Sequence, residues 1–207
     1  MAETNKSKMI LDALQQLMEE KDIQNISVSE IASKAGIGKG SIYYYYPSKD
    51  AILDALIRRS YEQPLQTAKN LTTKTNLSSF TRMAMLFQAC RSSSVIFLNN
   101  NRLSEASAQS LALLHQKHLH YLISELKPAL TEIISQGIAC GEIHFEYPEA
   151  LAEIALIVLA VKLDNSIVPS TSEDTEKTLK GLIALLEKGT DVPAGTLGYL
   201  SIKNYEE

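Results

Sequence analysis

This sequence of 207 residues has no tryptophan and only two cysteines. Cys90 and Cys140 cannot form a disulfide framework, and we expect both to be small buried hydrophobic residues within helices. Long apolar runs are missing as well. The longest extends from Ile154 to Val161, whereas a membrane-spanning helix needs about 20 apolar residues. The sequence therefore predicts no membrane partner.

The beginning of the chain lacks the features of an export signal. Met1 to Lys8 are polar and include one acid, and no apolar segment follows them. We therefore predict a cytoplasmic protein. Apolar residues make up 45% and charged residues 21% of the sequence, which is typical of an ordinary globular protein. The length predicts one or two domains.

An overall excess of positive charge is also lacking, because the formal net charge is −4. The distribution of charge along the chain is uneven, however. Between Lys34 and Arg59 the chain has five basic residues and two acidic ones. A local basic surface of this kind attracts phosphate groups even on an acidic protein. The charge balance is therefore compatible with a nucleic-acid partner.

Common catalytic motifs are absent too. The sequence has no GxSxG nucleophile motif, no GxxxxGK phosphate loop, no dinucleotide-binding fingerprint, and neither HExxH nor paired CxxC. His115 and His118 share one face of a predicted helix, but His120 lies about 140° from His115 and points elsewhere. We predict that the protein is not an enzyme, with no catalytic residue, no metal site and no cofactor.

Helical periodicity dominates the first 60 residues. Apolar residues recur at three- and four-residue spacing from about Lys6 to Lys21, which predicts one helix with a buried stripe. Ser27 and Glu30 have the spacing of a capping box at the start of a second helix. Gly36 is expected to end that helix in a left-handed turn.

A third and a fourth helix follow in this first part. The third is predicted from about residue 38 to residue 46, where Pro47 ends it because its ring disfavours a helical conformation in the residue before it. Ser48 is the expected N-cap of the fourth helix. No strand-like alternation occurs in this stretch, so the first part reads as all-α.

The remainder predicts a second, larger helical domain. Pro64 and the polar stretch 72–79 are expected to form the joint. Helical patterns cover residues 79–91, 94–99, 104–114, 115–137, 148–165 and 173–188. We therefore predict an all-α fold with two domains, residues 1–60 and residues 61–207.

The most informative segment runs from Ile26 to Leu53. Two short helices joined by a tight glycine turn meet the physical requirement of a helix-turn-helix, whose second helix enters the major groove of DNA. The pattern consists of Ser27, Ile31-Ala32, Ala35-Gly36-Ile37, Lys39-Gly40-Ser41, Ile42 to Tyr46 and Lys49. With these residues the segment resembles the DNA-binding domain of the TetR (tetracycline repressor) family of regulators. Tyr46 departs from the pattern, because the family usually has an apolar residue there.

The resemblance implies eight residues that would bind double-stranded operator DNA. Serines at the start of the first helix would donate to phosphate, and the lysine and serine at the start of the second would face the major groove. A glycine between them would let the backbone approach, while two tyrosines would contact phosphate and sugar. A further lysine would close the phosphate clamp. The residues are Ser27, Ser29, Lys39, Gly40, Ser41, Tyr43, Tyr44 and Lys49.

Several of these residues also have simpler interpretations. Ser27 can serve only as an N-cap, and Lys39 can be merely solvated. The tyrosines cannot all face one way on a helix with 3.6 residues per turn. Ile42 and Tyr46 are four residues apart and are expected to point into the core, which leaves Tyr43 to Tyr45 for DNA. A buried Tyr46 would need a partner for its hydroxyl.

Two late segments are apolar around most of their circumference. The patterns at 148–165 and 173–188 predict helices that are buried on most sides. Two such helices from each subunit would form a four-helix interface, which is the homodimer that the resemblance implies. The alternative is that both belong to the core of a single chain.

The resemblance also implies that the larger domain binds a small-molecule effector. The candidates on the middle helices are Met83, Phe87, Phe97, His118 and Tyr121. Their other interpretation is plain core packing, which uses such residues everywhere. The fold predicted as a whole is an N-terminal three-helix helix-turn-helix domain followed by a larger helical domain for ligand binding and dimerisation.

The predicted function is a ligand-responsive dimeric transcriptional regulator, a repressor in the family's usual mode. It would bind a palindromic operator and be released when a small molecule changes the spacing of the two recognition helices. The alternative is a helical interaction or scaffold protein that keeps the fold without binding an operator.

Overall fold

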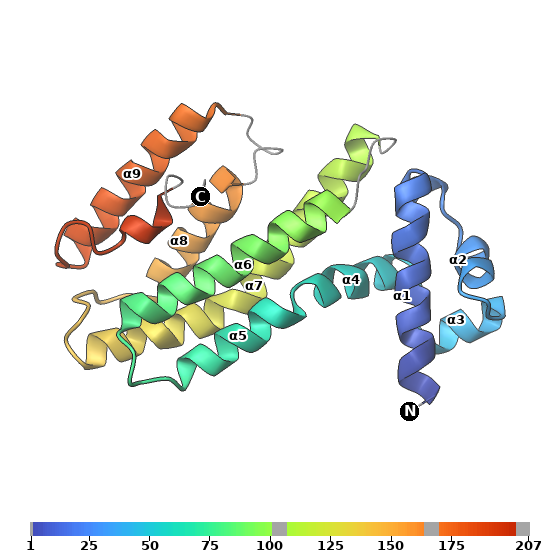
Figure 1. Cartoon of the computed structure of the whole chain (residues 1–207), viewed down its shortest axis with the longest axis horizontal. Coiled ribbons are helices and arrows are strands. Elements are labelled where there is room, and N and C mark those ends of the chain that lie inside the picture. The colour runs from blue at the N-terminus through green and yellow to red at the C-terminus, as the bar shows by residue number, and fades with distance from the viewer. Residues whose placement is uncertain (1, 101–106, 164–169, 202–207) are drawn as a thin grey trace. The chain divides into compact units, whose positions relative to one another are not determined.

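A computed structural model of the chain describes residues 2–100, 107–163 and 170–201 (Figure 1). Every regular element in these ranges is a helix, which confirms the predicted all-α fold. The elements are α1 (Ala2–Glu20), the short 3₁₀ helix η1 (Ile23–Asn25), α2 (Val28–Lys34), α3 (Lys39–Tyr45), α4 (Lys49–Ser60), α5 (Glu62–Thr72), α6 (Ser79–Asn100), α7 (Ala108–Ala139), α8 (Pro148–Leu163), α9 (Ser172–Gly189) and η2 (Gly198–Leu200).

The chain divides into two compact units. Unit 1 comprises residues 1–62 and 93–118, and unit 2 comprises residues 63–92 and 119–207. The first stretch of unit 1 ends close to the predicted domain boundary at residue 60. Unit 1 also includes the beginning of α7, which the sequence alone assigned to the second domain.

Local capping interactions set the helix boundaries in unit 1 where the sequence predicted them. The hydroxyl of Ser27 accepts a bond from the backbone N–H of Glu30, and the carboxylate of Glu30 accepts one from the N–H of Ser27. Gly36 ends α2 with a φ of 66°, in the left-handed region that glycine adopts without steric cost. Ser48 caps α4 through the N–H of Ala51.

The core of unit 1 is built from one apolar stripe on each of its first helices. α1 packs against α2 and α4, and α2 packs against α3. The side chains of Ile10, Leu14, Ile31, Ile42 and Ile52 are completely buried there. This packing holds α2 and α3 in fixed positions, so that their outer faces can present polar residues to a ligand.

A buried carboxylate joins η1 to the first turn of α7 within unit 1. Asp22 is only 8% exposed, and its carboxylate accepts bonds from the hydroxyl of Ser110 at 2.6 Å, the N–H of Ser107 and the N–H of Gln24. These bonds favour the charged form, so they hold the pKa of Asp22 well below its usual range. The same carboxylate therefore caps one helix and anchors another.

Two further polar contacts tie α7 to the other helices of unit 1. The ammonium of Lys117 binds Asp54 of α4 at 2.7 Å and Asp50 at 3.4 Å. Burial opposes its charge, but these carboxylates raise the pKa of Lys117. The hydroxyl of Tyr61, at the end of α4, hydrogen-bonds the imidazole of His118, and both side chains are buried. The first three turns of α7 are thus held by specific polar bonds.

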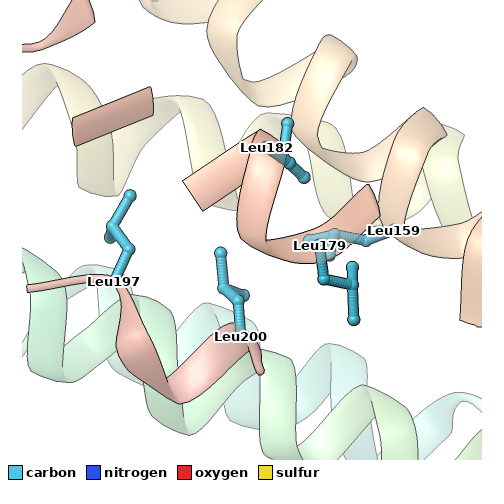
Figure 2. Close-up of a cluster of buried hydrophobic side chains, with 5 residues drawn as sticks. All are labelled: Leu159, Leu179, Leu182, Leu197 and Leu200. Carbon is cyan, nitrogen blue, oxygen red and sulfur yellow. The ribbon is translucent and has the colours of Figure 1, made fainter. Parts of the chain in front are cut away.

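The core of unit 2 includes a cluster of five buried leucines, shown in Figure 2. It joins α8 and α9 to the chain that follows α9. Glu187 on α9 holds this following segment in place, because its buried carboxylate accepts a hydrogen bond from the N–H of Leu197 at 2.8 Å. The cluster consists of Leu159, Leu179, Leu182, Leu197 and Leu200.

Beyond residue 61 the structure has longer helices than the sequence predicts. The sequence predicts no helix at the position of α5, because Pro64 is expected to belong to a joint. Pro64 lies in the first turn of α5, where the missing N–H needs no helical partner. Helix α6 is continuous where a break near residue 92 was predicted, and α7 is continuous across residues 114 and 115. No glycine or proline occurs at either point.

Cys140 corrects the expectation that both cysteines are buried. It lies just beyond the end of α7, and its side chain is exposed. The side chain of Cys90 lies outside the described residues. In the part of the chain that is described, no helix has the length and apolar character needed to cross a membrane.

Candidate nucleic-acid interface

Helices α2 and α3 form the short helix pair that the sequence predicted between Ser27 and Pro47. The turn between them is closed by backbone bonds, including one from the N–H of Ile37 to the carbonyl of Ala32 at 3.0 Å. Gly38 then provides the N-cap position of α3 without a side-chain cap. The first N–H groups of α3 therefore have no side chain bound to them at the N-cap.

One face of α3 presents polar and aromatic side chains to solvent. Lys39 and Gly40 are exposed, and no atom lies within 4 Å of the position that a Cβ of Gly40 would occupy. Tyr43 is 50% exposed and Tyr44 is 74% exposed. On the opposite face Ile42 is completely buried, as predicted from its spacing. An approaching ligand would therefore meet lysine, glycine and tyrosine.

The remaining candidates on α2 and α3 are less open. Ser41 is half-buried, whereas Ser29 is exposed at the start of α2. Ser27 is exposed too, but its hydroxyl already donates to Glu30 at 2.7 Å. Its capping role is therefore present in the structure, and its predicted contact with phosphate stays a prediction. Tyr45 is half-buried beside Tyr44, with the two ring centroids 5.2 Å apart.

The unusual Tyr46 does find a partner for its hydroxyl. That hydroxyl lies 2.7 Å from the hydroxyl of Ser7 on α1. Tyr46 is the C-cap residue of α3, so the bond links the end of α3 to the second turn of α1. A phenylalanine at this position could not form it.

Lys49 is oriented differently from what its predicted role requires. Its ammonium donates to the backbone carbonyls of Ile23 at 2.8 Å and Ile26 at 2.8 Å, and lies 3.4 Å from that of Gln24. These carbonyls end η1 and lead into α2. A contact between Lys49 and phosphate would have to compete with these bonds, so its place in the phosphate clamp stays a prediction.

Two ion pairs neutralise basic residues beside the helix pair. Lys21 binds Glu30, and Lys34 binds Glu20 at 2.7 Å. The hydrogen bonds from Lys21 and Ser27 lower the pKa of Glu30 from its ordinary value of 4.5 to about 2. Positive charge on this side of unit 1 is therefore scarcer than the sequence count indicates.

Acid is expected to destabilise the start of α2. Because the pKa of Glu30 is lower in the folded state than its ordinary 4.5, ionised Glu30 stabilises the fold above about pH 4.5. That contribution is lost as the pH falls toward 2, the folded-state pKa. In thermal unfolding, Glu30→Gln should lower the melting temperature by a few degrees at neutral pH and flatten its decline below pH 4.5. Glu62→Gln is the control, and an identical profile for both variants would contradict the assignment.

The effector candidates do not all belong to one unit. His118 is bonded to Tyr61 in unit 1, whereas Met83, Phe87 and Tyr121 are half-buried side chains of unit 2. Phe87 packs against the leucine cluster of Figure 2, in agreement with its alternative interpretation as a core residue. The side chain of Phe97 lies outside the described residues. Binding of an effector by these residues stays a prediction.

Comparison with known protein families agrees with this geometry. Residues 10–56, which include α2 and α3, match the model of the bacterial regulatory proteins of the tetR family. Residues 94–183 match the model of a tetracyclin repressor-like C-terminal domain. The chain belongs to the TetR family.

Individual relatives of this TetR-family protein match only part of its length. YuxN, an uncharacterized HTH-type transcriptional regulator of Bacillus subtilis, is 35% identical over 69 residues, which are 33% of this chain and 24% of YuxN. The HTH-type transcriptional regulator EthR of Mycobacterium tuberculosis is 39% identical over 54 residues, 26% of this chain and 25% of EthR. The matched segments thus span about a quarter of these relatives.

The similarity of the fold extends over nearly the whole TetR-family chain. The crystal structure of RolR in complex with resorcinol is similar to this chain, with a TM-score of 0.60 and 18% sequence identity. The match covers 97% of this chain and 96% of the RolR chain. At this identity the likeness shows the fold alone. It confirms the predicted order of an N-terminal helix-turn-helix and a larger helical domain.

The sequence did not predict the bonds made by Asp22, Ser7 or Lys117. Each is a single polar residue on a helix or beside one, and nothing in its neighbours distinguishes it from a solvated residue. Asp22 does cap η1, a role that Asp often has. The residue type of Asp22 could therefore have indicated its cap of η1. Nothing in the sequence indicated its bonds to Ser107 and Ser110 of the α7 region.

Proposed function

We propose that the protein is a dimeric transcriptional regulator that binds a palindromic operator, represses transcription and is released by a small-molecule effector. The observation that carries the proposal is the exposed face of α3, with Lys39, Gly40, Tyr43 and Tyr44 outward and Ile42 buried. Such a helix can enter the major groove while the core holds its other face. Family membership supports the same function.

The proposed DNA contacts follow from the position of each residue. Lys39 would reach base edges, with guanine O6 and N7 as the acceptors that suit its ammonium. Gly40 leaves room for a close approach of the backbone to phosphate. The hydroxyls of Tyr43 and Tyr44 would reach phosphate or sugar oxygens. Ser29 and Ser41 would add contacts at the edges of this surface.

The homodimer is supported by apolar side chains that unit 2 leaves exposed. Ile154 and Ile157 on α8 are 53% and 43% exposed, and Leu185 on α9 is 72% exposed. Helices α8 and α9 contact each other, so these exposed side chains lie on neighbouring helices of unit 2. Large apolar side chains gathered on neighbouring helices are typical of a protein interface. A second copy of the chain would cover them in a four-helix arrangement.

The proposed effector would act through α7. This helix begins in unit 1, where Asp22, Tyr61 and the acids of α4 hold it, and ends in unit 2. An effector that binds unit 2 and displaces α7 would therefore disturb bonds that position α4 and η1. Met83, Phe87 and Tyr121 are the proposed contacts in unit 2. The effector and DNA would then favour two different positions of α7, so that binding of one weakens binding of the other.

An electrophoretic mobility shift with the promoter region next to the gene tests the function. A salt-sensitive, sequence-selective shift is expected, because phosphate contacts weaken with salt and base contacts select sequence. Failure to shift any fragment at low salt would overturn the proposal. The alternative, a helical interaction or scaffold protein, predicts that failure, and the family matches do not favour it. We also propose a cytoplasmic location without a membrane partner or enzymatic activity.

Two lysine variants separate DNA recognition from structural support. Lys39→Ala should reduce the preference for operator over random DNA by roughly 5- to 100-fold, the effect of one base contact, and leave thermal stability unchanged. Lys49→Ala should lower stability by roughly 1–3 kcal/mol, because two partly buried carbonyls, of Ile23 and Ile26, lose a charged donor. Competition binding assays and thermal unfolding of both variants measure this. A Lys49→Ala variant of full stability that weakens all DNA equally would instead restore its role in the phosphate clamp.

A further inference from the structure

Most of the basic side chains of unit 1 are already bound within the protein. Lys21, Lys34, Arg59 and Lys117 are in ion pairs, and the ammonium of Lys49 is bound by backbone carbonyls. Arg58 is engaged as well. Among the described residues of unit 1, the lysines without an ion pair or hydrogen-bond partner are Lys6, Lys8 and Lys39.

A DNA-binding surface with Lys39 as its single available cation would be weak. Sequence-independent affinity comes almost entirely from cations that replace the counterions of phosphate. The protein has a net charge of −4, so its general field does not attract DNA either. Further phosphate contacts must come from cations that lie near α3 and are available to bind.

Lys6 and Lys8 meet both conditions. They flank Ser7, whose hydroxyl lies 2.7 Å from that of Tyr46 at the end of α3. Both lysines are exposed. Figure 1 shows α3 beside the half of α1 that carries the N-terminus. The bond between Ser7 and Tyr46 therefore fixes the turn of α1 that carries both lysines against the end of α3.

We propose that Lys6 and Lys8 on α1 extend the DNA interface and bind the phosphate backbone beside the groove that α3 enters. Tyr46 has a positioning role in this interface, because its hydroxyl fixes the second turn of α1 against the end of α3. This inference rests on the proposed function, since it needs DNA as the ligand. It adds a sequence-independent contact to the contacts of α3.

The test uses the full-length chain and a short fluorescent DNA duplex of mixed sequence, followed by fluorescence anisotropy over a series of KCl concentrations. The double variant Lys6→Gln/Lys8→Gln should bind roughly 10-fold more weakly at low salt. The slope of log affinity against log salt should fall by roughly 1–2, since each lost phosphate contact contributes about 0.9. Thermal unfolding should be unchanged, because both side chains are exposed.

The matched control is Lys69→Gln/Lys74→Gln, which removes the same charge from two exposed lysines of unit 2. A control that keeps the wild-type slope, together with a reduced slope for Lys6→Gln/Lys8→Gln, supports the proposal. Equal losses in both double variants would mean that only net charge matters and would overturn it. Wild-type affinity in the Lys6/Lys8 variant would overturn it as well, while the proposed function would stand. A wild-type chain that binds no DNA would overturn both.

Discussion

A chain carrying Leu185→Glu is expected to be a monomer at concentrations where the wild-type chain is a dimer. Leu185 is 72% exposed in the single chain, so the substitution should not disturb the core of unit 2. In the proposed homodimer the same side chain is buried, and a carboxylate there would be a buried charge without a partner. Such a charge costs about 3–5 kcal/mol, which weakens association more than 100-fold.

Sedimentation velocity and mobility shift measure the two consequences of this change. The Leu185→Glu chain should sediment as a monomer and lose most of its affinity for a palindromic operator, because each half-site would be bound separately. Ile157→Glu on α8 should have the same effect. Met85→Glu, at a position of α6 that is 40% exposed, is the control and should remain dimeric. A dimeric Leu185→Glu chain would remove α9 from the proposed interface.

Gly137→Ala is expected to destabilise unit 2 although alanine is the better helix former. A Cβ at Gly137 would lie 2.7 Å from the Oγ and 2.9 Å from the Cβ of Ser79, and 2.8 Å from the Cδ1 of Ile143. Ser79 is fully buried at the start of α6, and its N–H is bound to Glu142. Because the Cβ of Ser79 cannot rotate away, the backbones of α6 and α7 would have to separate.

The expected size of this effect follows from two opposing terms. Overpacking of a tight core costs about 1–3 kcal/mol, and the higher helix propensity of alanine offsets roughly 1 kcal/mol. With two backbone segments forced apart, we expect a net loss of about 1–2 kcal/mol and a melting temperature lower by roughly 2–8 °C. Gly40→Ala, where nothing lies within 4 Å, is the control and should not lower it. An unchanged melting temperature for Gly137→Ala would show that α6 and α7 can adjust freely.

Interactions between close neighbours in the chain could be predicted well. The capping box of Ser27 and Glu30, the left-handed Gly36 and the cap at Ser48 all involve residues within a few positions of each other. Residue type alone then decides the geometry. The division of α3 into a buried and an exposed face follows from helical periodicity in the same way, which is why Ile42 lies in the core.

The helix boundaries of unit 2 were harder to predict, because they depend on packing as well as on neighbouring residues in the chain. A proline or a polar stretch is compatible both with a loop and with the first turn of a helix, as Pro64 at the start of α5 illustrates. Packing against the rest of the unit decides between them. The apolar character of α8 and α9 was evident from the sequence, but the periodicity could not separate Leu182, which is buried, from Leu185, which is exposed.

The sequence by itself determined the helix-turn-helix, its boundaries and the residues that could face DNA. The tertiary structure decided which of their polar groups are available. Lys49 bonds to Ile26, Ser7 to Tyr46 and Asp22 to Ser110, across separations of 23, 39 and 88 residues. Only the packed helices bring these partners together, because such bonds depend on three-dimensional distance and not on spacing along the chain. The bonds of Lys49 turn its side chain inward. Together with the ion pairs of the other basic residues, they leave Lys6, Lys8 and Lys39 as available cations of unit 1 among the described residues.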